Sequence, residues 1–166
     1  MKSRAPLFGL TIQQPWANCI VHGSKRVENR EWRPRRSMPF WLAIHAGQTD
    51  DRVNEEWVRT QFPQLVPALF WKRGAILGVC RVVEVVAYLE MPEEQQEQHN
   101  AWLSGPWCWI LEDVVGLVEP IQCKGSQGLW PLTDDLLQEV RREYARTNAI
   151  RRDGRVAETY RKTRSA

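Results

Sequence analysis

Short apolar, β-rich runs alternate with short amphipathic segments along most of the chain, which predicts a sheet with helices inserted between its strands. The expected strands cover residues 7–12, 26–32, 40–45, 74–88, 107–113 and 118–123. Apolar residues at helical spacing predict helices over 15–22, over 50–61 with Asp50 as the N-cap, and over 134–147. The polar, acidic segment 90–100 is interpreted as a helix or a lid.

The order of these elements shows neither a regular βαβ alternation nor an internal repeat. We therefore expect an α+β fold, a small mixed or antiparallel β-barrel of about six strands with peripheral helices. The 166 residues are enough for one domain with its own core. A single domain is predicted over 1–148, followed by a basic, flexible C-terminal tail over 149–166.

Composition, charge and hydropathy change this picture at four points. The nine tryptophans are unusual, because tryptophan fills cores but also stacks on bases and lines ligand clefts. Residues 141–166 carry nine Lys or Arg against three acids, which is typical of a solvated terminus and can also attract phosphate. The four cysteines lack metal-ligand spacing, so we expect no metal and no other cofactor. The chain shows no signal peptide and no membrane-spanning run, which predicts a cytoplasmic protein.

The densest polar pattern is Gly23-x-Lys25-x-x-Glu28-x-Arg30. On a strand, side chains two residues apart lie on the same face, so Glu28 and Arg30 are expected to point the same way. Lys25 is expected at the start of that strand, after a turn at Gly23. A cluster of this composition is often a solvated salt-bridge network. The same cluster also has the charges that a polar substrate site needs.

This motif, after a strand and a short Gln-Pro-Trp-Ala helix, resembles that of the ASCH (activating signal cointegrator homology) domain, a family of PUA-like barrels. The segments 105–113 and 125–130 resemble the closing strands of bacterial and phage members, so the resemblance covers roughly residues 7–132. It implies a cleft lined by the motif's Lys, Glu and Arg, and a substrate related to nucleic acid. Some small members remove acyl groups from N4 of cytidine, and others are ribonucleases or DNA-binding modules.

The resemblance implies Lys25 and Glu28 as catalytic residues, with Glu97 as a further carboxylate. In the amidohydrolase members, a threonine stands three residues after the lysine, and here that position is Glu28. The further carboxylate is expected after the long strand, and Glu93 and Glu94 stay open beside Glu97, as do two glutamates on neighbouring strands, Glu84 and Glu112. The expected substrate-binding residues are Gln14, Trp16, Ser24, Arg30, Trp32 and His45.

Two functions of different class follow from these residues. The first is a metal-free amidohydrolase acting on N4-acylated cytosine nucleosides, in which the lysine and the carboxylates supply acid–base chemistry. The alternative is a non-catalytic module that binds RNA or a modified base, and a ribonuclease is a third and weaker alternative. The expected partner is a modified nucleoside or RNA, not a membrane, and we expect a monomer or a weak dimer.

Overall fold

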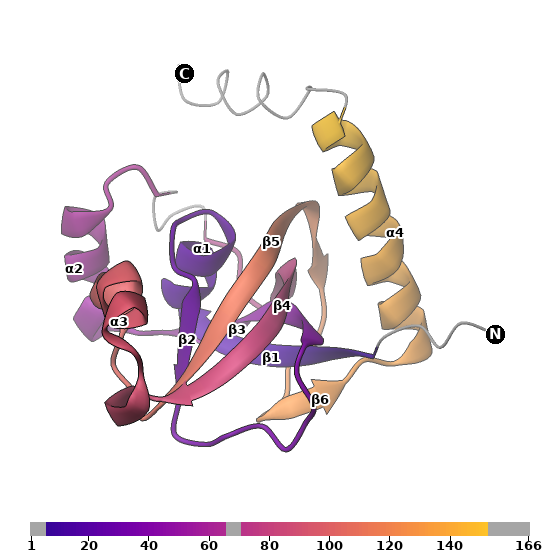
Figure 1. The fold of residues 1–166 in the computed structure, drawn as a ribbon. Coiled ribbons are helices and arrows are strands. Elements are labelled where there is room, and N and C mark those ends of the chain that lie inside the picture. Colours follow the sequence, from indigo (N-terminus) through magenta and orange to yellow (C-terminus); the bar gives the residue numbers. More distant parts are fainter. Residues whose placement is uncertain (1–5, 66–70, 153–166) are drawn as a thin grey trace.

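The fold is a single curved sheet with helices packed on its two sides, and the computed structural model describes residues 6–65 and 71–152 (Figure 1). The strands are β1 (Leu7–Gln14), β2 (Val27–Arg30), β3 (Phe40–Asp50), β4 (Ala75–Ala87), β5 (Trp107–Gln122) and β6 (Leu129–Pro131). The helices are α1 (Trp16–Val21), α2 (Arg52–Gln61), α3 (Glu93–His99) and α4 (Asp134–Arg152). Two 3-10 turns, η2 (Tyr88–Glu90) and η3 (Asn100–Trp102), flank α3.

The six strands lie in the order β2-β5-β4-β3-β1-β6. The pair β1–β3 is parallel, and the other four pairs are antiparallel. The predicted α+β fold, with a mixed sheet of six strands and peripheral helices, is confirmed. The barrel does not close, because within the described residues no ladder joins the two edge strands, β2 and β6.

Several boundaries differ from the predicted ones. The expected strands 107–113 and 118–123 are one strand, β5, which stays continuous through Asp113 although that residue has a φ of 51°. The N-cap of α2 is Asp51, whose side chain accepts from Asn54 N, whereas Asp50 forms an ion pair with Arg73. Helix α4 continues to Arg152 rather than ending near residue 147. The predicted tail from 153 onward lies outside the described residues.

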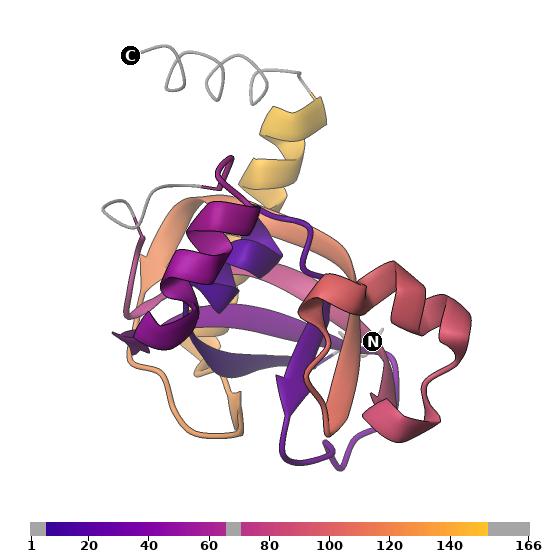
Figure 2. The same cartoon turned by 90° about the vertical axis from the view of Figure 1, so that its left-hand side faces the viewer.

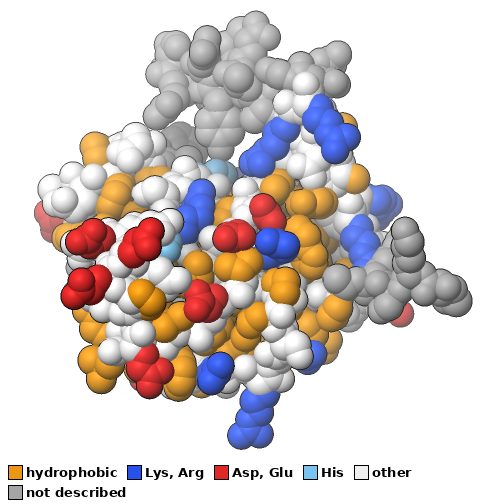
Figure 3. Space-filling view, in the orientation of Figure 1, with side chains coloured by type: hydrophobic (Ala, Val, Ile, Leu, Met, Phe, Trp, Pro, Cys, Tyr) orange, Lys and Arg blue, Asp and Glu red, His pale blue; other side chains and the backbone are white. Residues whose placement is uncertain are grey.

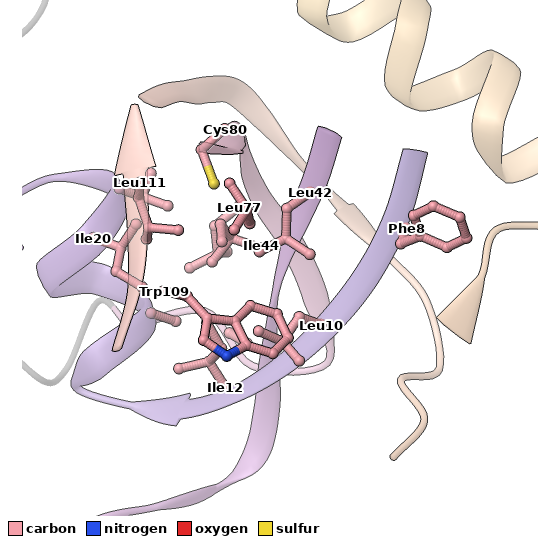
Figure 4. Close-up of a cluster of buried hydrophobic side chains, with 14 of the residues drawn as sticks. Phe8, Leu10, Ile12, Ile20, Leu42, Ile44, Leu77, Cys80, Trp109 and Leu111 are labelled. Atoms are coloured by element: carbon pink, nitrogen blue, oxygen red, sulfur yellow. The ribbon is translucent and has the colours of Figure 1, made fainter. Parts of the chain in front are cut away.

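The main core lies between the concave face of the sheet and α1 (Figure 4). Alternate residues of β1 and β3 point into it, because successive side chains of a strand face opposite sides. Trp109 on β5 is fully buried at its centre and packs edge-to-face against Phe40 and Trp32, with ring centroids 6.2 and 4.9 Å away. A second cluster on the other face packs against α4 through Val140 and Tyr144.

The helices are distributed unevenly around the sheet. Helices α1, α2 and α3 gather on one side, with β2 between them, while α4 packs on the opposite side (Figures 1 and 2). In the described part of the chain, no helix is both long and apolar enough to cross a membrane. The crowded side, where three helices meet the edge strand β2, holds the candidate site.

Candidate functional site

A pocket of about 380 Å³ opens between α1, α2, the edge strand β2, and η3 with the residues that follow it. Its lining combines aromatic rings with charged and amide groups. The lining residues are Trp16, Lys25, Glu28, Asn29, Asp51, Asn54, Trp57, Ala101, Trp102, Leu103 and Ser104. This volume lies within the range of small-molecule sites, and the mixture of aromatic walls with a few polar groups is typical of them.

A chain of ion pairs forms the base of the pocket. Lys25 Nζ donates to Glu28 Oε2 at 2.9 Å and also to the Val27 carbonyl, while Arg30 lies 3.1 Å from Glu28 Oε1. Lys25 and Glu28 are only 3% and 6% exposed. A buried charge is tolerated only when it is paired and hydrogen-bonded, and each of these charges is. The predicted cluster is therefore a buried network rather than a solvated surface face.

The local backbone explains why the motif needs its glycine. Gly23 lies so close to α1 that an added Cβ would be 2.7 Å from the Cys19 carbonyl oxygen. Lys25 N donates to that same carbonyl at 3.1 Å. The Arg26 guanidinium then donates to three carbonyls at the end of α1 and in the following turn, those of Ile20, Gly23 and Lys25. This tight turn aims the Lys25 side chain inward, toward Glu28.

Three tryptophans from three different elements surround the opening. The rings of Trp16 and Trp102 lie 6.4 and 6.1 Å from Trp57, measured between centroids. Trp102 also stacks on Phe62 at 4.3 Å with an interplanar angle of 22°. Trp102 is buried, whereas Trp57 is 39% exposed and lies at the solvent-facing edge of the opening. The walls are rigid aromatic surfaces, which suit a flat apolar ligand face.

Two polar residues hold these walls together. The Trp16 indole N–H donates to Asp51 Oδ2 at 3.0 Å, which links α1 to the start of α2. Burial raises the pKa of Asp51, but hydrogen bonds from Asn54 and Trp16 more than offset it and leave the pKa below its usual value. On the opposite wall, Asn29 donates to the Trp102 carbonyl at 2.8 Å and accepts from Ser104 N at 3.1 Å.

The structure brings together three of the predicted site residues, Lys25, Glu28 and Trp16, in the pocket lining. Arg30 lies behind Glu28 and reaches the Thr11 carbonyl at 2.9 Å, so it joins β2 to β1 instead of lining the pocket. Gln14 is fully buried and is a structural residue, because it bonds Asn18 and the Lys72 carbonyl.

Three other predicted substrate-binding residues lie outside the pocket lining. Ser24 is exposed, in the turn before Lys25. Trp32 follows β2 and packs on Trp109, because the strand ends at Arg30 and the chain then turns toward the core. His45 is buried beside Trp130, and its Nε2 lies 3.1 Å from the Cys123 carbonyl. Burial lowers the pKa of His45, and the hydrogen bond to Cys123 opposes that shift.

Glu97 is exposed on α3 and lies outside the pocket lining, as do the other glutamates considered for its role. Glu84 accepts from Gln95, Glu112 pairs with Arg81, and Glu93 and Glu94 face solvent in the first turn of α3. The second carboxylate that does line the pocket is Asp51. The sequence pattern predicted the N-cap of α2 at Asp50 rather than Asp51, and an N-cap pattern gave no reason to place a carboxylate beside Lys25.

Sequence reasoning also missed Asn29, Asn54, Trp57 and Trp102 as pocket residues. The unusual tryptophan content was the available signal, yet it could not distinguish the pocket tryptophans from core ones such as Trp109. In the described ranges, 6–65 and 71–152, His, Cys, Asp and Glu side chains form no group of three or more that could hold a metal. The pocket's own chemistry is thus a buried ammonium, two carboxylates, amides and aromatic faces.

This fold and this motif define a domain class, and the comparison of sequences assigns the chain to it. The ASCH domain model matches residues 10–122, so the chain belongs to the ASCH domain family, which has a PUA-like fold. Activating signal cointegrator 1 of Homo sapiens is 24% identical over 148 residues, and that of Mus musculus is 22% identical over 152 residues. Each match covers 84% of this chain and 24% of the relative, so the chain spans about a quarter of those proteins.

Solved structures agree with this fold. The ASCH protein from Zymomonas mobilis superposes with a TM-score of 0.50 and 16% identity, covering 81% of this chain and 93% of that one. A single-substitution variant of the same protein gives the same TM-score and identity over 96% of its length. At this level of identity the likeness concerns the fold alone.

Proposed function

We propose that the pocket binds a single nucleobase, presented by a modified nucleoside or by RNA. The observation that carries this proposal is that the pocket combines aromatic walls from Trp16, Trp57 and Trp102 with a charged floor. The Lys25–Glu28 ion pair forms that floor. A nucleobase has two flat π-faces, which match the aromatic walls, and an edge of hydrogen-bond donors and acceptors, which matches the charged floor. The volume of about 380 Å³ suits one nucleoside rather than a folded RNA element.

Binding is better supported than turnover because the pocket's carboxylates already have partners. The two Glu28 oxygens face Lys25 and Arg30, and Asp51 accepts from Trp16 and Asn54. A general base needs a free oxygen within reach of the water it activates. The Lys25 ammonium, in contrast, has three N–H donors and uses two of them for Val27 and Glu28, so the third can donate to a base carbonyl or ring nitrogen.

Replacing Trp57 tests this proposal directly. Trp57→Leu should weaken binding of a short single-stranded RNA or of N4-acetylcytidine about 5–150-fold, because base–aromatic stacking contributes about 1–3 kcal/mol. Isothermal titration calorimetry measures the loss. The matched control is Trp41→Leu, because Trp41 packs on Tyr144 of α4 and lies outside the pocket lining. Equal losses in both variants, or no binding of either ligand by the native protein, would remove the proposal.

A second candidate function is hydrolysis of N4-acylated cytosine nucleosides, and the position of the Lys25 ammonium favours it. A buried ammonium that the fold holds in place can stabilise the oxyanion that forms when water attacks the acyl carbon. It can then give a proton to N4 as the carbon–nitrogen bond breaks. Glu28 can take the proton of the attacking water once one of its oxygens has exchanged its Lys25 or Arg30 partner for that water. The products are the free acid and the cytosine nucleoside.

The activity test follows cytidine released from N4-acetylcytidine by chromatography. If the pocket is catalytic, Lys25→Ala should abolish release and leave the native fold intact, as judged by circular dichroism. Lys124→Ala is the matched control, because Lys124 is an exposed lysine outside the pocket lining and should keep full activity. Unchanged release by Lys25→Ala would contradict the catalytic role. If calorimetry shows that N4-acetylcytidine binds but no cytidine is released, the pocket binds a nucleobase without hydrolysing it.

A further inference from the structure

A groove of about 560 Å³ lies beside the proposed nucleobase pocket, and Ser104 lines both of them. One wall is the end of β4 with η2, and the other is the turn that leads into β5. The lining residues are Glu31, Ala87, Tyr88, Leu89, Glu90, Ser104, Gly105, Pro106 and Trp107. Nothing in the proposed nucleobase function uses this groove.

The groove is apolar, exposed and held open by the backbone. Leu89 is 92% exposed and Tyr88 is 41% exposed, which places two large apolar side chains in water. Tyr88 N donates to the Pro106 carbonyl at 2.8 Å, which fixes the distance between the walls. Gly105 has a φ of 54°, and an added Cβ would lie 2.9 Å from the Tyr88 Cβ. The groove is therefore a formed surface rather than a loose loop, and exposed apolar surface of this kind marks interaction sites.

The rim of this groove is acidic, because the described residues that line it include two glutamates and neither lysine nor arginine. Residues 84–105 contain five glutamates and no lysine or arginine, although the whole chain has a net charge of +3. Glu90 lines the groove from η2 and Glu31 lines it from the residue after β2, and both are exposed. Acidic side chains gather over α3 in the space-filling view, with apolar atoms beside them (Figure 3). Such a rim repels the phosphates of nucleic acid and attracts a cationic partner.

Trp107, which lines the groove, already contacts a guanidinium group of this chain. Arg33 lies over the Trp107 ring, with its Cζ 5.5 Å from the ring centroid. This is the geometry of a cation–π contact, in which a cation is attracted to the negative face of an aromatic ring. Tyr88, on the facing wall, offers a second ring to an incoming arginine.

From these features we infer that the groove docks a basic peptide segment of another protein, rich in arginine or lysine and carrying one large apolar side chain. The apolar side chain packs against Leu89 and Tyr88, and the flanking cations pair with Glu31 and Glu90. Because the groove borders the pocket at Ser104, a docked segment lies next to whatever base the pocket holds. The ASCH domain thereby joins a ligand pocket to a site for a basic protein segment.

The test uses a fluorescein-labelled ten-residue peptide of arginine and lysine with a central leucine–phenylalanine pair. Fluorescence anisotropy should show binding that weakens with added salt, and Leu89→Ser and Glu90→Lys should each weaken it at least fivefold. Val53→Ser and Glu56→Lys are the matched controls on α2, because Val53 is 89% exposed and Glu56 is exposed, and both lie outside the groove. These two should bind the peptide like the native protein.

Three results would overturn the inference. The first is no binding, or equal loss in the test and control variants. The second is a concentration-dependent dimer in sedimentation that Leu89→Ser abolishes, which would assign the groove to a second copy of the chain. The third is displacement of the peptide by a single-stranded RNA in both the native protein and the Trp57→Leu variant, because this would place RNA in the groove itself.

Discussion

Glu28→Ala should unfold at a temperature roughly 6–20 °C below the native protein. The substitution leaves the Lys25 ammonium buried without its carboxylate and removes the partner of Arg30. Breaking a buried ion pair from one side costs about 3–5 kcal/mol, because the remaining charge is left uncompensated in a poorly solvated site. Each kcal/mol moves the midpoint by about 2–4 °C in a domain of this size. Urea unfolding followed by circular dichroism measures the free energy directly.

Two further variants separate this effect from ordinary charge removal. Lys25→Met should cost only about 1–2 kcal/mol, because Glu28 keeps its ion pair with Arg30 after the hydrogen bonds of Lys25 are lost. Glu112→Ala removes an exposed partner of Arg81 and should cost less than about 1 kcal/mol. A Glu28→Ala protein as stable as the Glu112→Ala protein would show that the network is solvated in solution and not buried.

Trp109→Ala should destabilise the domain by about 3–5 kcal/mol, the usual range for removing a large aromatic side chain from a core. Trp109 is fully buried where β5 crosses the main core, and it packs on both Phe40 and Trp32. The cavity would also lie next to the Glu28 side chain, because Glu28 and Trp109 are directly opposed on neighbouring strands and share one face of the sheet. Urea unfolding should show a lower midpoint with little change in slope.

Trp109→Phe and Trp57→Ala are the comparisons for this prediction. Trp109→Phe should cost less than the alanine variant, since it keeps a ring in the core and removes an indole N–H that has no partner among the described residues. Trp57→Ala changes a half-exposed tryptophan and should cost about 1 kcal/mol or less. If Trp57→Ala proved as costly as Trp109→Ala, the core would not centre on Trp109.

The combined site has consequences for how the domain works. Lys25 and Glu28 are held by the fold, so they need no rearrangement to meet a ligand. Trp57, by contrast, lies at an exposed edge of the opening, where a base can reach it. Stability changes should therefore follow substitutions at Glu28, and affinity changes should follow substitutions at Trp57. Measuring both quantities on both variants distinguishes the structural part of the site from its binding part.

The sequence by itself determined the type of sheet and the centre of the site. Hydrophobic runs such as 40–45 and 74–88 predict strands because β-branched and apolar residues pack well on a pleated surface. Glu28 and Arg30 were expected on one face of a strand from their spacing alone, and they form an ion pair with each other. Gly23 was expected at the end of the first helix, and its close approach to Cys19 explains why a side chain does not fit there.

Only the tertiary structure decided which distant residues join that centre. Asp51, Trp57 and Trp102 come from segments that meet β2 through packing, and no local pattern encodes those distances. Glu97 illustrates the same limit, because its position after the long strand suggested a site residue, while the path of α3 leaves it exposed. Local preferences fix an element and the face each side chain takes. The partner across a pocket depends on how whole elements pack, which is a property of the entire chain.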